Sequence, residues 1–228
     1  MLVSPVIILY TFREKTDMRT KNIAILVSGG GTNLQAIIDA YNAGKITNGK
    51  LALVISSNPR AYALERAEKN NIDRCVIQKG DNREAFSDAI LNKLEEYEID
   101  IIVLAGFMHI LSGKIIEKYR NKILNVHPAL IPSFCGEGFY GLRVHKAALE
   151  KGVKVTGATV HFVNEIADGG PIILQKAVYI EETDTPETLQ KRVMENAEWE
   201  ILPKSLDLLC NDRISVDNNI VKIISDKT

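Results

Sequence analysis

Residues 23–33 read IAILVSGGGTN, an apolar run that stops at a serine and three glycines. A continuous apolar run of this length is typical of a buried strand, and glycines allow the chain to turn sharply. From Asn33 to residue 43 the apolar residues recur at helical spacing. This stretch therefore predicts a strand, a tight glycine turn and a helix, in that order.

The same unit recurs three times in the residues that follow. The predicted strands cover residues 51–55, 74–77 and 101–104, and the helices after them cover residues 61–69, 83–97 and from Gly106 to about residue 119. Four strand and helix units in succession predict a parallel sheet that is covered by helices on both faces, with right-handed crossovers.

The alternation of strands and helices ends after a fifth predicted strand at residues 123–126. The elements predicted beyond it are a proline- and glycine-rich loop at 128–141, a helix near 144–150 and an antiparallel strand pair at 155–163 and 172–180. A long helix follows, which Thr185 caps, which reaches about Cys210 and which can bend at Pro203. The last predicted element is a hairpin at 214–224. We therefore expect an α/β fold with a mostly parallel central sheet, helices on both faces and an antiparallel extension in the C-terminal half.

The composition is that of a folded, soluble globular protein. Of 228 residues, 46% are hydrophobic and 25% are charged, which places the chain away from the disordered class. The 28 lysines and arginines nearly balance the 29 aspartates and glutamates, and a net charge of −1 provides no overall field to hold nucleic acid or an acidic membrane. We expect neither as a partner, although a local anion site is compatible with this balance.

The cysteines and the N-terminus indicate the compartment. Cys75, Cys135 and Cys210 are odd in number, far apart and outside any C-x-x-C spacing. This pattern argues against a disulfide framework and a zinc cluster, and it favours a reducing, cytoplasmic compartment. Residues 2–12 are apolar, but the run is too short to span a bilayer and lacks the flanks of a signal peptide.

One domain at residues 21–228 is the simplest organisation, because this range contains no repeat, low-complexity tract or linker. Within it we distinguish a half at 21–120 that contains the glycine turn, a half at 121–210 and a C-terminal hairpin at 211–228. Residues 1–20 are an N-terminal extension. Its first 17 residues are either an upstream start before Met18 or an appended edge segment.

The glycine turn has the features of an anion site. Glycines expose backbone N–H groups, and the helix that follows directs the positive end of its dipole at the turn. The turn is not a Walker loop, since no Lys-Ser/Thr pair follows, and Leu34 stands where a dinucleotide fingerprint needs its third glycine. Two interpretations remain: a tight turn without a ligand, or a site for the phosphate of a mononucleotide or sugar phosphate.

A polar pair interrupts the fifth strand at its C-terminal end, the edge at which open α/β sheets bind ligands. Asn125 and His127 are two residues apart, so both side chains leave the same face of the strand. An amide can donate to a developing oxyanion, and an imidazole can transfer a proton near neutral pH. The alternative is a core histidine that only satisfies its own hydrogen bonds.

Asp168 lies with two glycines in the turn between the two later β runs. By itself such a sequence is typical of turn chemistry. Together with His127, its carboxylate can stabilise an imidazolium and pass protons through water. Cys135 has no helix N-terminus to activate it as a nucleophile, and His161, inside an apolar run, is more typical of a structural histidine than of a metal ligand.

Five segments of the sequence together resemble one known family. They are ILVSGGGTNLQ at 25–35, LAGFMHIL at 104–111, NVHPALIP at 125–132, TVHFV at 159–163 and DGGPIILQ at 168–175. In this order they are similar to the phosphoribosylglycinamide formyltransferases (glycinamide ribonucleotide transformylases) of purine biosynthesis, over residues 22–210. The resemblance implies the Rossmann-like formyltransferase fold and transfer of a formyl group from 10-formyltetrahydrofolate to the amine of N1-(5-phospho-D-ribosyl)glycinamide.

The resemblance also implies roles for individual residues. Gly31, Thr32 and Asn33 would hold the substrate phosphate, which agrees with the anion interpretation, and Glu198 would contact the substrate glycinamide. The turn at 163–171 would face the pterin. The folate-binding residues that the resemblance implies are Arg83, Met108, His109, Ile110, Leu111 and Asn125.

In the reaction that the resemblance implies, the substrate amine attacks the formyl carbon. Asn125 donates to the carbonyl oxygen as it becomes tetrahedral, and His127 in its charged form stabilises the oxyanion. Asp168 supports the imidazolium and helps to pass the amine proton to N10. No metal is implied, and we expect a monomer or a weak homodimer that uses two small-molecule substrates.

Two features depart from the common pattern of the family. His109 stands where many members have arginine, and residues 134–141 form a longer loop than usual. Other folate-dependent formyltransferases and 10-formyltetrahydrofolate hydrolases remain as alternatives, but we see no trace of the basic tRNA-binding domain or the regulatory domain that these enzymes add. A non-enzymatic nucleotide-binding module would leave the pair of Asn125 and His127 unexplained.

Overall fold

The computed structural model describes residues 19–224, and of Arg83 only the backbone. The strands of its main sheet are β1 (Lys21–Val27), β2 (Gly49–Ser56), β3 (Asp73–Val76), β4 (Ile101–Leu104), β5 (Ile123–His127), β6 (Val155–Phe162) and β7 (Ile172–Tyr179). The helices are α1 (Thr32–Asn42), α2 (Tyr62–Lys69), α3 (Arg83–Glu96), α4 (Gly113–Lys118), α5 (Leu142–Lys151), α6 (Pro186–Val193), the π-helical η1 (Met194–Glu198) and α7 (Trp199–Cys210). A hairpin of β8 (Ile214–Asp217) and β9 (Ile220–Ile223) follows.

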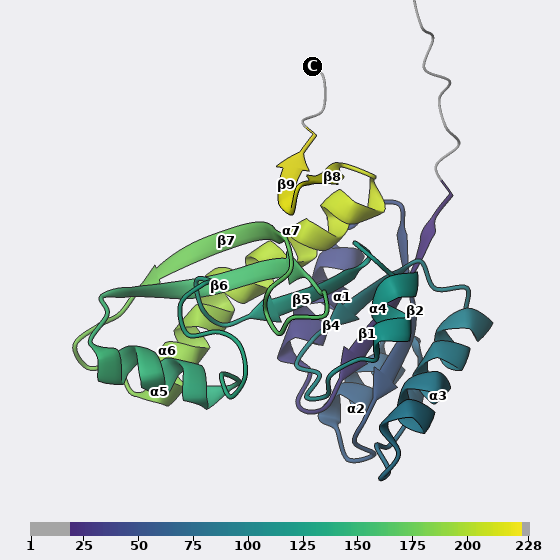
Figure 1. The fold of residues 1–228 in the computed structure, drawn as a ribbon, viewed down its shortest axis with the longest axis horizontal. Helices are drawn as coiled ribbons and strands as arrows, with labels where there is room; N and C mark the ends of the chain where they lie inside the picture. Colours follow the sequence, from purple (N-terminus) through teal and green to yellow (C-terminus); the bar gives the residue numbers. More distant parts are fainter. Residues whose placement is uncertain (1–18, 225–228) are drawn as a thin grey trace, which may run out of the picture.

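The sheet has the order β3-β2-β1-β4-β5-β6-β7. The first five strands of this order are parallel, and β6 and β7 run antiparallel to their neighbours. Figure 1 shows β6 and β7 extending beyond the parallel strands, together with α5 and α6. The predicted α/β fold, a mostly parallel sheet with an antiparallel extension in the second half, is confirmed.

Alternate residues of β1 serve the two faces of the sheet. Ile23 and Ile25 belong to the hydrophobic cluster that includes residues of α1 and α7, whereas Ala24 and Leu26 belong to the cluster with residues of α3 and α4. All four are fully buried, because β2 and β4 flank β1 and helices cover both faces. Burial on both faces explains why this strand reads as a continuous apolar run in the sequence.

The helix expected after Gly106 is shorter than predicted. Gly106 has a φ of 74°, and α4 begins only at Gly113. Between these residues the chain follows an irregular path, on which the backbone N–H of Met108 donates to Ser28 Oγ at 3.0 Å. Residues 107–110 therefore form a loop at the C-terminal edge of the sheet and not the face of a helix.

The long helix near the C-terminus departs from regular geometry in a different place from the one that the sequence indicated. Thr185 caps the helix and Pro186 is its first residue, as predicted. The interruption lies at η1, whereas Pro203 sits inside α7. A π turn accommodates an extra residue, which changes the direction of the side chains around it. Its last residue is Glu198.

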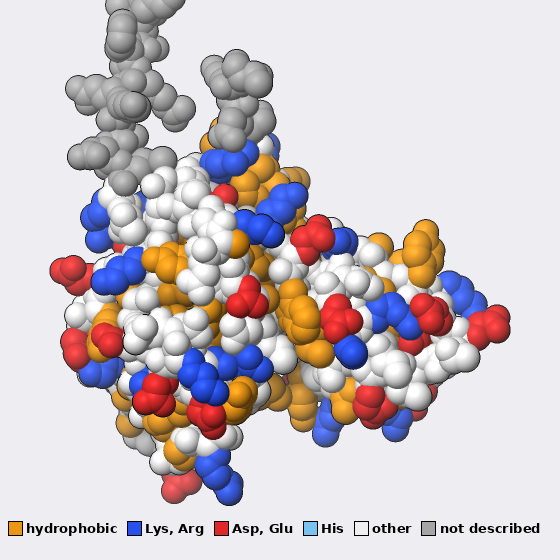
Figure 2. All heavy atoms as spheres, turned by 180° about the vertical axis from the view of Figure 1, so that it is seen from behind, with side chains coloured by type: hydrophobic (Ala, Val, Ile, Leu, Met, Phe, Trp, Pro, Cys, Tyr) orange, Lys and Arg blue, Asp and Glu red, His pale blue; other side chains and the backbone are white. Residues whose placement is uncertain are grey.

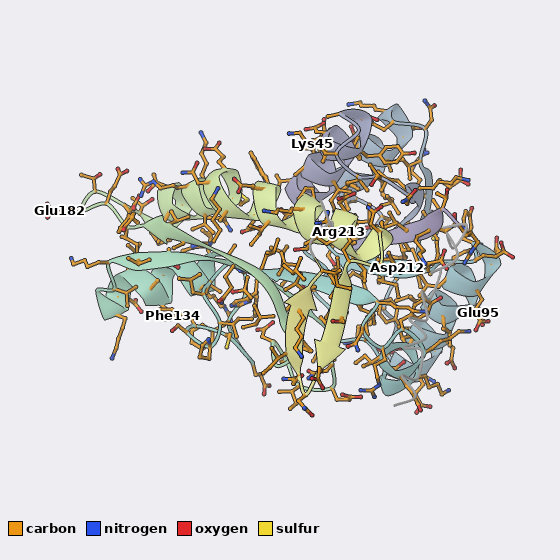
Figure 3. The ribbon with its side chains drawn as sticks, turned by 90° about the horizontal axis from the view of Figure 1, so that it is seen from above. Lys45, Glu95, Phe134, Glu182, Asp212 and Arg213 are labelled. Atoms are coloured by element: carbon orange, nitrogen blue, oxygen red, sulfur yellow. The ribbon has the colours of Figure 1, made fainter. Side chains whose placement is uncertain are left out.

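Asp212 and Arg213 lead from α7 into the β8–β9 hairpin (Figure 3), which confirms the predicted hairpin. Asn218 and Asn219 both have positive φ angles, of 49° and 64°, as a two-residue hairpin turn requires. The expected N-terminal extension lies outside the described residues except for its last two, as do the final four residues of the chain.

Charged side chains of both signs are interspersed over the face of the molecule that Figure 2 shows. This distribution agrees with the balanced composition of the sequence. Among residues 19–224, none of the helices has the length and the apolar character that a membrane span requires.

Candidate active site

A cavity of about 530 Å³ opens at the C-terminal ends of β4 and β5, between the loop after β4, the loop before α5 and η1. Eight of the residues proposed from the sequence line it: Asn33, Met108, His109, Ile110, Asn125, His127, Asp168 and Glu198. Open α/β sheets bind ligands at this edge. The cavity is therefore the candidate active site.

Asn125 is oriented by a histidine on the neighbouring strand. The antiparallel register of β5 and β6 places His161 directly opposite Asn125. The Nδ1–H group of His161 donates to the carbonyl oxygen of Phe162 at 2.8 Å, so in the neutral ring Nε2 accepts a hydrogen bond from Asn125 Nδ2 at 3.1 Å. One N–H of the Asn125 amide is thereby used, and the second, which has no acceptor among the described residues, remains for a ligand.

Both ring nitrogens of His127 face oxygen atoms of the protein. Nε2 lies 2.8 Å from the carbonyl oxygen of Phe134, on the loop before α5 (Figure 3), and Nδ1 lies 3.5 Å from Asp168 Oδ2. Burial lowers the pKa of His127 below its ordinary value of 6.5, while the Asp168 carboxylate and the Phe134 carbonyl oppose this shift. The ring is therefore neutral near pH 7, in an environment that can stabilise its protonated form.

Asp168 is held as a carboxylate by groups from two segments. Its Oδ2 atom accepts from the backbone N–H of Gly136 at 2.8 Å, and Oδ1 lies 3.6 Å from His161 Nε2. Burial alone would raise the pKa of Asp168, but the contacts with His161, Gly136 and His127 outweigh it and lower the pKa below the ordinary 3.8. Asp168 is therefore negatively charged throughout the physiological range.

The turn that carries Asp168 depends on its glycines. Asp168 itself has a positive φ of 54°, which short polar residues tolerate. A Cβ atom on Gly170 would lie 1.8 Å from the carbonyl oxygen of Phe162, so a larger residue cannot occupy this position. The aspartate and glycines thus form both the tight turn and the carboxylate site, the two interpretations that the sequence left open.

Glu198 and Asn33 meet on the opposite wall of the cavity. Asn33 Nδ2 donates to Glu198 Oε2 at 2.6 Å, and both residues are buried. Burial raises the pKa of Glu198 to about 7, and the hydrogen bond from Asn33 opposes this shift only in part. Near neutral pH this carboxyl group can therefore exist in both protonation states.

The glycine turn lies beside this wall, at the start of α1. Gly31 is the N-cap residue, with a φ of 71°, and a Cβ atom there would lie 2.7 Å from the Cβ of Ala63. The first N–H groups of a helix have no partner within the helix. Asn33 reaches the cavity, while Gly31 and Thr32 stand at the same helix end without lining it.

The loop after β4 forms the apolar wall of the cavity. Met108 and Ile110 are exposed there, and the ring of His109 packs edge-on against Phe86 and Phe107, with centroid distances of 5.3 Å and 5.5 Å. Burial, followed by the positive charge of Lys79, lowers the pKa of His109.

Two residues of the predicted folate set differ from the others in their placement. The side chain of Leu111 is buried in the hydrophobic cluster with α3 and α4 and does not line the cavity. Arg83 is the first residue of α3, and its side chain lies outside what the structure describes.

Comparisons with known proteins place the chain in a family. Residues 21–206 match the family model described as formyl transferase. The phosphoribosylglycinamide formyltransferase of Haemophilus influenzae is 41% identical over 202 residues, which cover 88% of this chain and 92% of that protein.

The chain belongs to the formyl transferase family. A solved structure, glycinamide ribonucleotide transformylase 1 from Symbiobacterium toebii, resembles this formyl transferase with a TM-score of 0.85 and 40% identity, over 90% of this chain and 95% of that chain. The human trifunctional purine biosynthetic protein adenosine-3 is 42% identical over 205 residues, which cover 89% of this chain. The match covers 20% of that longer protein, so this chain corresponds to about a fifth of its length. The resemblance inferred from the five motifs is confirmed.

Several residues of this formyl transferase site escaped the sequence reasoning. His161 looked like a structural strand histidine, yet it contacts both Asn125 and Asp168. Its one signal was the antiparallel pairing of its strand with the Asn-x-His strand, and the register of that pairing cannot be read from the sequence. The cavity-lining side chains that were missed are Phe107, Val126, Pro128, Phe139, Tyr140, Gln190 and Met194.

Cys135 lies on the loop that contacts His127 and Asp168 but has no sign of activation in this formyl transferase. Its Sγ lies 3.3 Å from the carbonyl oxygen of Pro132. Burial, and next the Asp168 carboxylate, raise the pKa of the Cys135 thiol. A raised pKa disfavours the thiolate, in agreement with the sequence argument against a cysteine nucleophile.

Proposed function

We propose that this protein transfers the formyl group of 10-formyltetrahydrofolate to the amine of N1-(5-phospho-D-ribosyl)glycinamide, a step of purine (IMP) biosynthesis. One observation carries the proposal: Asn125, His127 and Asp168 share one cavity with Glu198 and Asn33. Groups that can stabilise an oxyanion and transfer a proton thus face groups that can bind an amine. The names of the relatives described above support the same reaction.

We assign Glu198 to the glycinamide end of the acceptor substrate. With a pKa of about 7, its ionised form is available near neutral pH to accept an N–H of the incoming amine. Asn33 Oδ1 is buried and has no hydrogen-bond partner among residues 19–224, and buried polar atoms of this kind are normally satisfied. A donor on the same substrate would satisfy it.

The transfer forms one bond to the formyl carbon and breaks another. The amine nitrogen attacks this carbon, the carbonyl oxygen becomes an oxyanion, and the bond from the carbon to N10 then breaks. Asn125 donates its second N–H to this oxygen, since His161 already holds the first. A donor that is fixed before the reaction contributes on the order of 10²- to 10³-fold to the rate.

We assign the proton transfer to His127. It is neutral in the empty cavity, so it can take up the proton that the attacking amine loses. The imidazolium is then stabilised by Asp168 and the Phe134 carbonyl, and its charge stabilises the oxyanion. The proton next goes to N10 as tetrahydrofolate departs. The charged histidine expected from the sequence is thus the intermediate form and not the resting one.

The folate would bind against the wall made by Met108, His109 and Ile110, with the Asp168 turn facing its pterin. Leu111 would contribute through its backbone, because its side chain belongs to the core. The acceptor's phosphate would bind at Gly31, Thr32 and the N-terminus of α1.

We further infer a cytoplasmic enzyme that acts as a monomer or weak homodimer on two small molecules, without a nucleic-acid or membrane partner. The balanced charge and the cysteine pattern support this inference. The proposed steps use only side chains and backbone groups and need no metal.

The test is a spectrophotometric assay of 10-formyltetrahydrofolate with and without the ribosylglycinamide phosphate, combined with mass spectrometry of the formylated product. We expect turnover only with the acceptor present, one product for each folate consumed. Deformylation at an equal rate without the acceptor would make the protein a hydrolase, with water as nucleophile, and would overturn the proposal. An Asp168→Asn variant in the same assay establishes that the activity arises at this site.

A further inference from the structure

We propose that Arg66 is a positioning residue for the substrate phosphate, because it fixes the glycine loop (residues 29–31) in the orientation that turns its backbone N–H groups toward an anion. Arg66 lies on α2, outside the loop. The inference relies on the proposed function only for the identity of the phosphate-bearing substrate.

Each carbonyl oxygen of the glycine loop has a hydrogen-bond donor. The Gly29 oxygen accepts from the backbone N–H of Ala63 at 3.2 Å, and the Gly31 oxygen accepts from the backbone N–H of Gln35 at 2.9 Å. The Gly30 oxygen accepts from Arg66 Nε at 2.9 Å. Backbone groups, which nearly every residue type supplies, hold two of these carbonyls, whereas the third depends on the side chain of Arg66.

These contacts also determine where the N–H groups point. A trans peptide is planar, so its C=O and N–H bonds point in opposite directions. Carbonyls that are held against α2 or within α1 therefore turn the N–H groups of residues 30–32 the other way. Within residues 19–224 none of these three N–H groups donates to a protein acceptor. They form a set of free donors at a helix N-terminus, as anion binding requires.

The peptide between Gly30 and Gly31 can rotate unless a group outside the loop holds it. The position of a Cβ atom on Gly30 is open space, and glycine adopts most backbone conformations. Rotation of the peptide between Gly30 and Gly31 would present a carbonyl oxygen to the phosphate in place of an N–H group. The bond from Arg66 opposes this rotation.

Arg66 is itself held in place by two further contacts. Its NH1 group donates to Gln35 Oε1 at 2.8 Å, and its guanidinium carbon lies 4.9 Å from the ring centroid of Tyr62. Figure 1 shows that the two helices that carry these residues, α1 and α2, lie on the same part of the fold, and the contacts between them are direct. A hollow of about 160 Å³ adjoins the start of α1, and its lining includes Thr32, Gln35 and Arg66 together with the carboxylate-bearing Asp39.

The charge of Arg66 is not cancelled by these partners. Its hydrogen bonds go to a backbone carbonyl and a side-chain amide, which are both neutral, and it forms no ion pair with any residue that the structure describes. The guanidinium therefore adds positive potential to that of the helix N-terminus.

The experiment compares the wild type with Arg66→Met, Arg66→Lys and the control Arg60→Met. Arg60 is an exposed arginine just before α2 whose side chain makes no hydrogen bond or ion pair with the described residues. Steady-state kinetics are measured with saturating 10-formyltetrahydrofolate and two acceptors, the ribosylglycinamide phosphate and the same compound without its phosphate. Thermal unfolding of each variant reports on its folding.

For Arg66→Met we expect the KM for the phosphorylated acceptor to rise about tenfold, with little change in kcat. With the acceptor that lacks a phosphate, the kcat/KM of Arg66→Met should equal that of the wild type, because this acceptor has no phosphate to bind at the glycine loop. Arg66→Lys keeps the charge and a hydrogen-bond donor but not the planar fork of the guanidinium. Its KM for the phosphorylated acceptor should therefore lie between the KM of the wild type and that of Arg66→Met. Arg60→Met should resemble the wild type with both acceptors.

Equal losses with the two acceptors, or an unchanged KM in Arg66→Met, would overturn the inference. If Arg66→Met does not fold, Arg66→Lys applies the same criterion. Calorimetric titration with ribose 5-phosphate separates this inference from the proposed function. If the wild type binds ribose 5-phosphate and Arg66→Met binds it at least tenfold more weakly, the positioning role of Arg66 is supported even if no formyl transfer is found. Equal binding of ribose 5-phosphate by both proteins would refute this role.

Discussion

At His127, two opposing effects act on the pKa of the imidazole, and the net shift is downward. Burial lowers it, and the Asp168 carboxylate, 3.5 Å from Nδ1, raises it. In the proposed mechanism the imidazole transfers the proton and the carboxylate stabilises the charged ring, so removal of either group should leave the other without its function.

We therefore expect His127→Ala and Asp168→Asn each to lower kcat by ~10²-fold or more, with both KM values largely kept. Steady-state kinetics with both substrates varied is the measurement. Cys135→Ser is the matched control, because this thiol lies on the loop whose backbone contacts His127 and Asp168, and its raised pKa disfavours reaction. Near-normal turnover in both variants would remove these residues from the mechanism.

Removal of the charge at Glu198 should have opposite effects on activity and on stability. In the folded protein its pKa is raised from the ordinary 4.5 to about 7, so ionisation opposes folding as the pH rises through this interval. Glu198→Gln keeps an acceptor for Asn33 without the charge. Near pH 8 the variant should be more stable in urea by up to about 3 kcal/mol, and near pH 4 the two proteins should be equal.

The same variant should lose the acid limb of the pH profile of kcat/KM for the acceptor. In the wild type this limb should rise through about 7, where Glu198 ionises. A stability difference that does not change with pH, or a variant with an unaltered pH profile, would show that Glu198 does not titrate in the way its burial requires.

At the scale of elements, α5 carries a buried group that links stability to pH. His145 is fully buried, and neither of its ring nitrogens has a hydrogen-bond partner among residues 19–224. Burial, and then the charge of His127, lower the pKa of His145 from the ordinary 6.5 to about 4. Because the unfolded chain binds a proton at the higher pKa, stability falls as the pH drops from about 6.5 toward 4.

For His145→Leu we expect the free energy of unfolding to change less between pH 7 and pH 5 than in the wild type, by about 2 kcal/mol. Urea unfolding at the two pH values measures this difference. Lys146→Leu, an exposed substitution on the same helix, should keep the wild-type dependence. Identical pH dependence in His145→Leu and the wild type would contradict the assignment.

At the scale of the whole molecule, the two predicted halves share one hydrophobic core. A single cluster contains Ile25 of β1 and Leu34 of α1 together with Leu124 of β5 and Leu202 of α7. Neither half can bury its apolar surface alone, because helices of the second half cover strands of the first.

We therefore predict one cooperative unfolding transition for the full chain, observed by circular dichroism and by fluorescence of Trp199 at the same midpoint. A fragment of residues 19–120 expressed alone should show no cooperative transition. Two separate transitions, or a fragment that melts cooperatively, would show that the halves are independent domains.

Most of the fold could be predicted because its signals are local. The strands β1, β2 and β4 of the first half are apolar runs, and the turn that follows each of the strands β1 to β4 contains glycine, proline or asparagine. The π turn could not be predicted, because MENAE at residues 194–198 fits a regular helix equally well. The late start of α4 was missed for a similar reason, since residues 107–110 are mostly apolar and Ser28, which binds this loop, lies on another element.

The sequence by itself determined the order of the elements and the mostly parallel sheet, since these depend on spacing and residue type along a few turns of chain, and its motifs indicated the residues that are proposed to carry the chemistry. Only the tertiary structure decided which side chains meet. Asn125 with His161, Asn33 with Glu198 and Arg66 with the glycine loop are contacts between different elements. Their geometry follows from strand register and helix packing, which the whole core determines and no local pattern specifies.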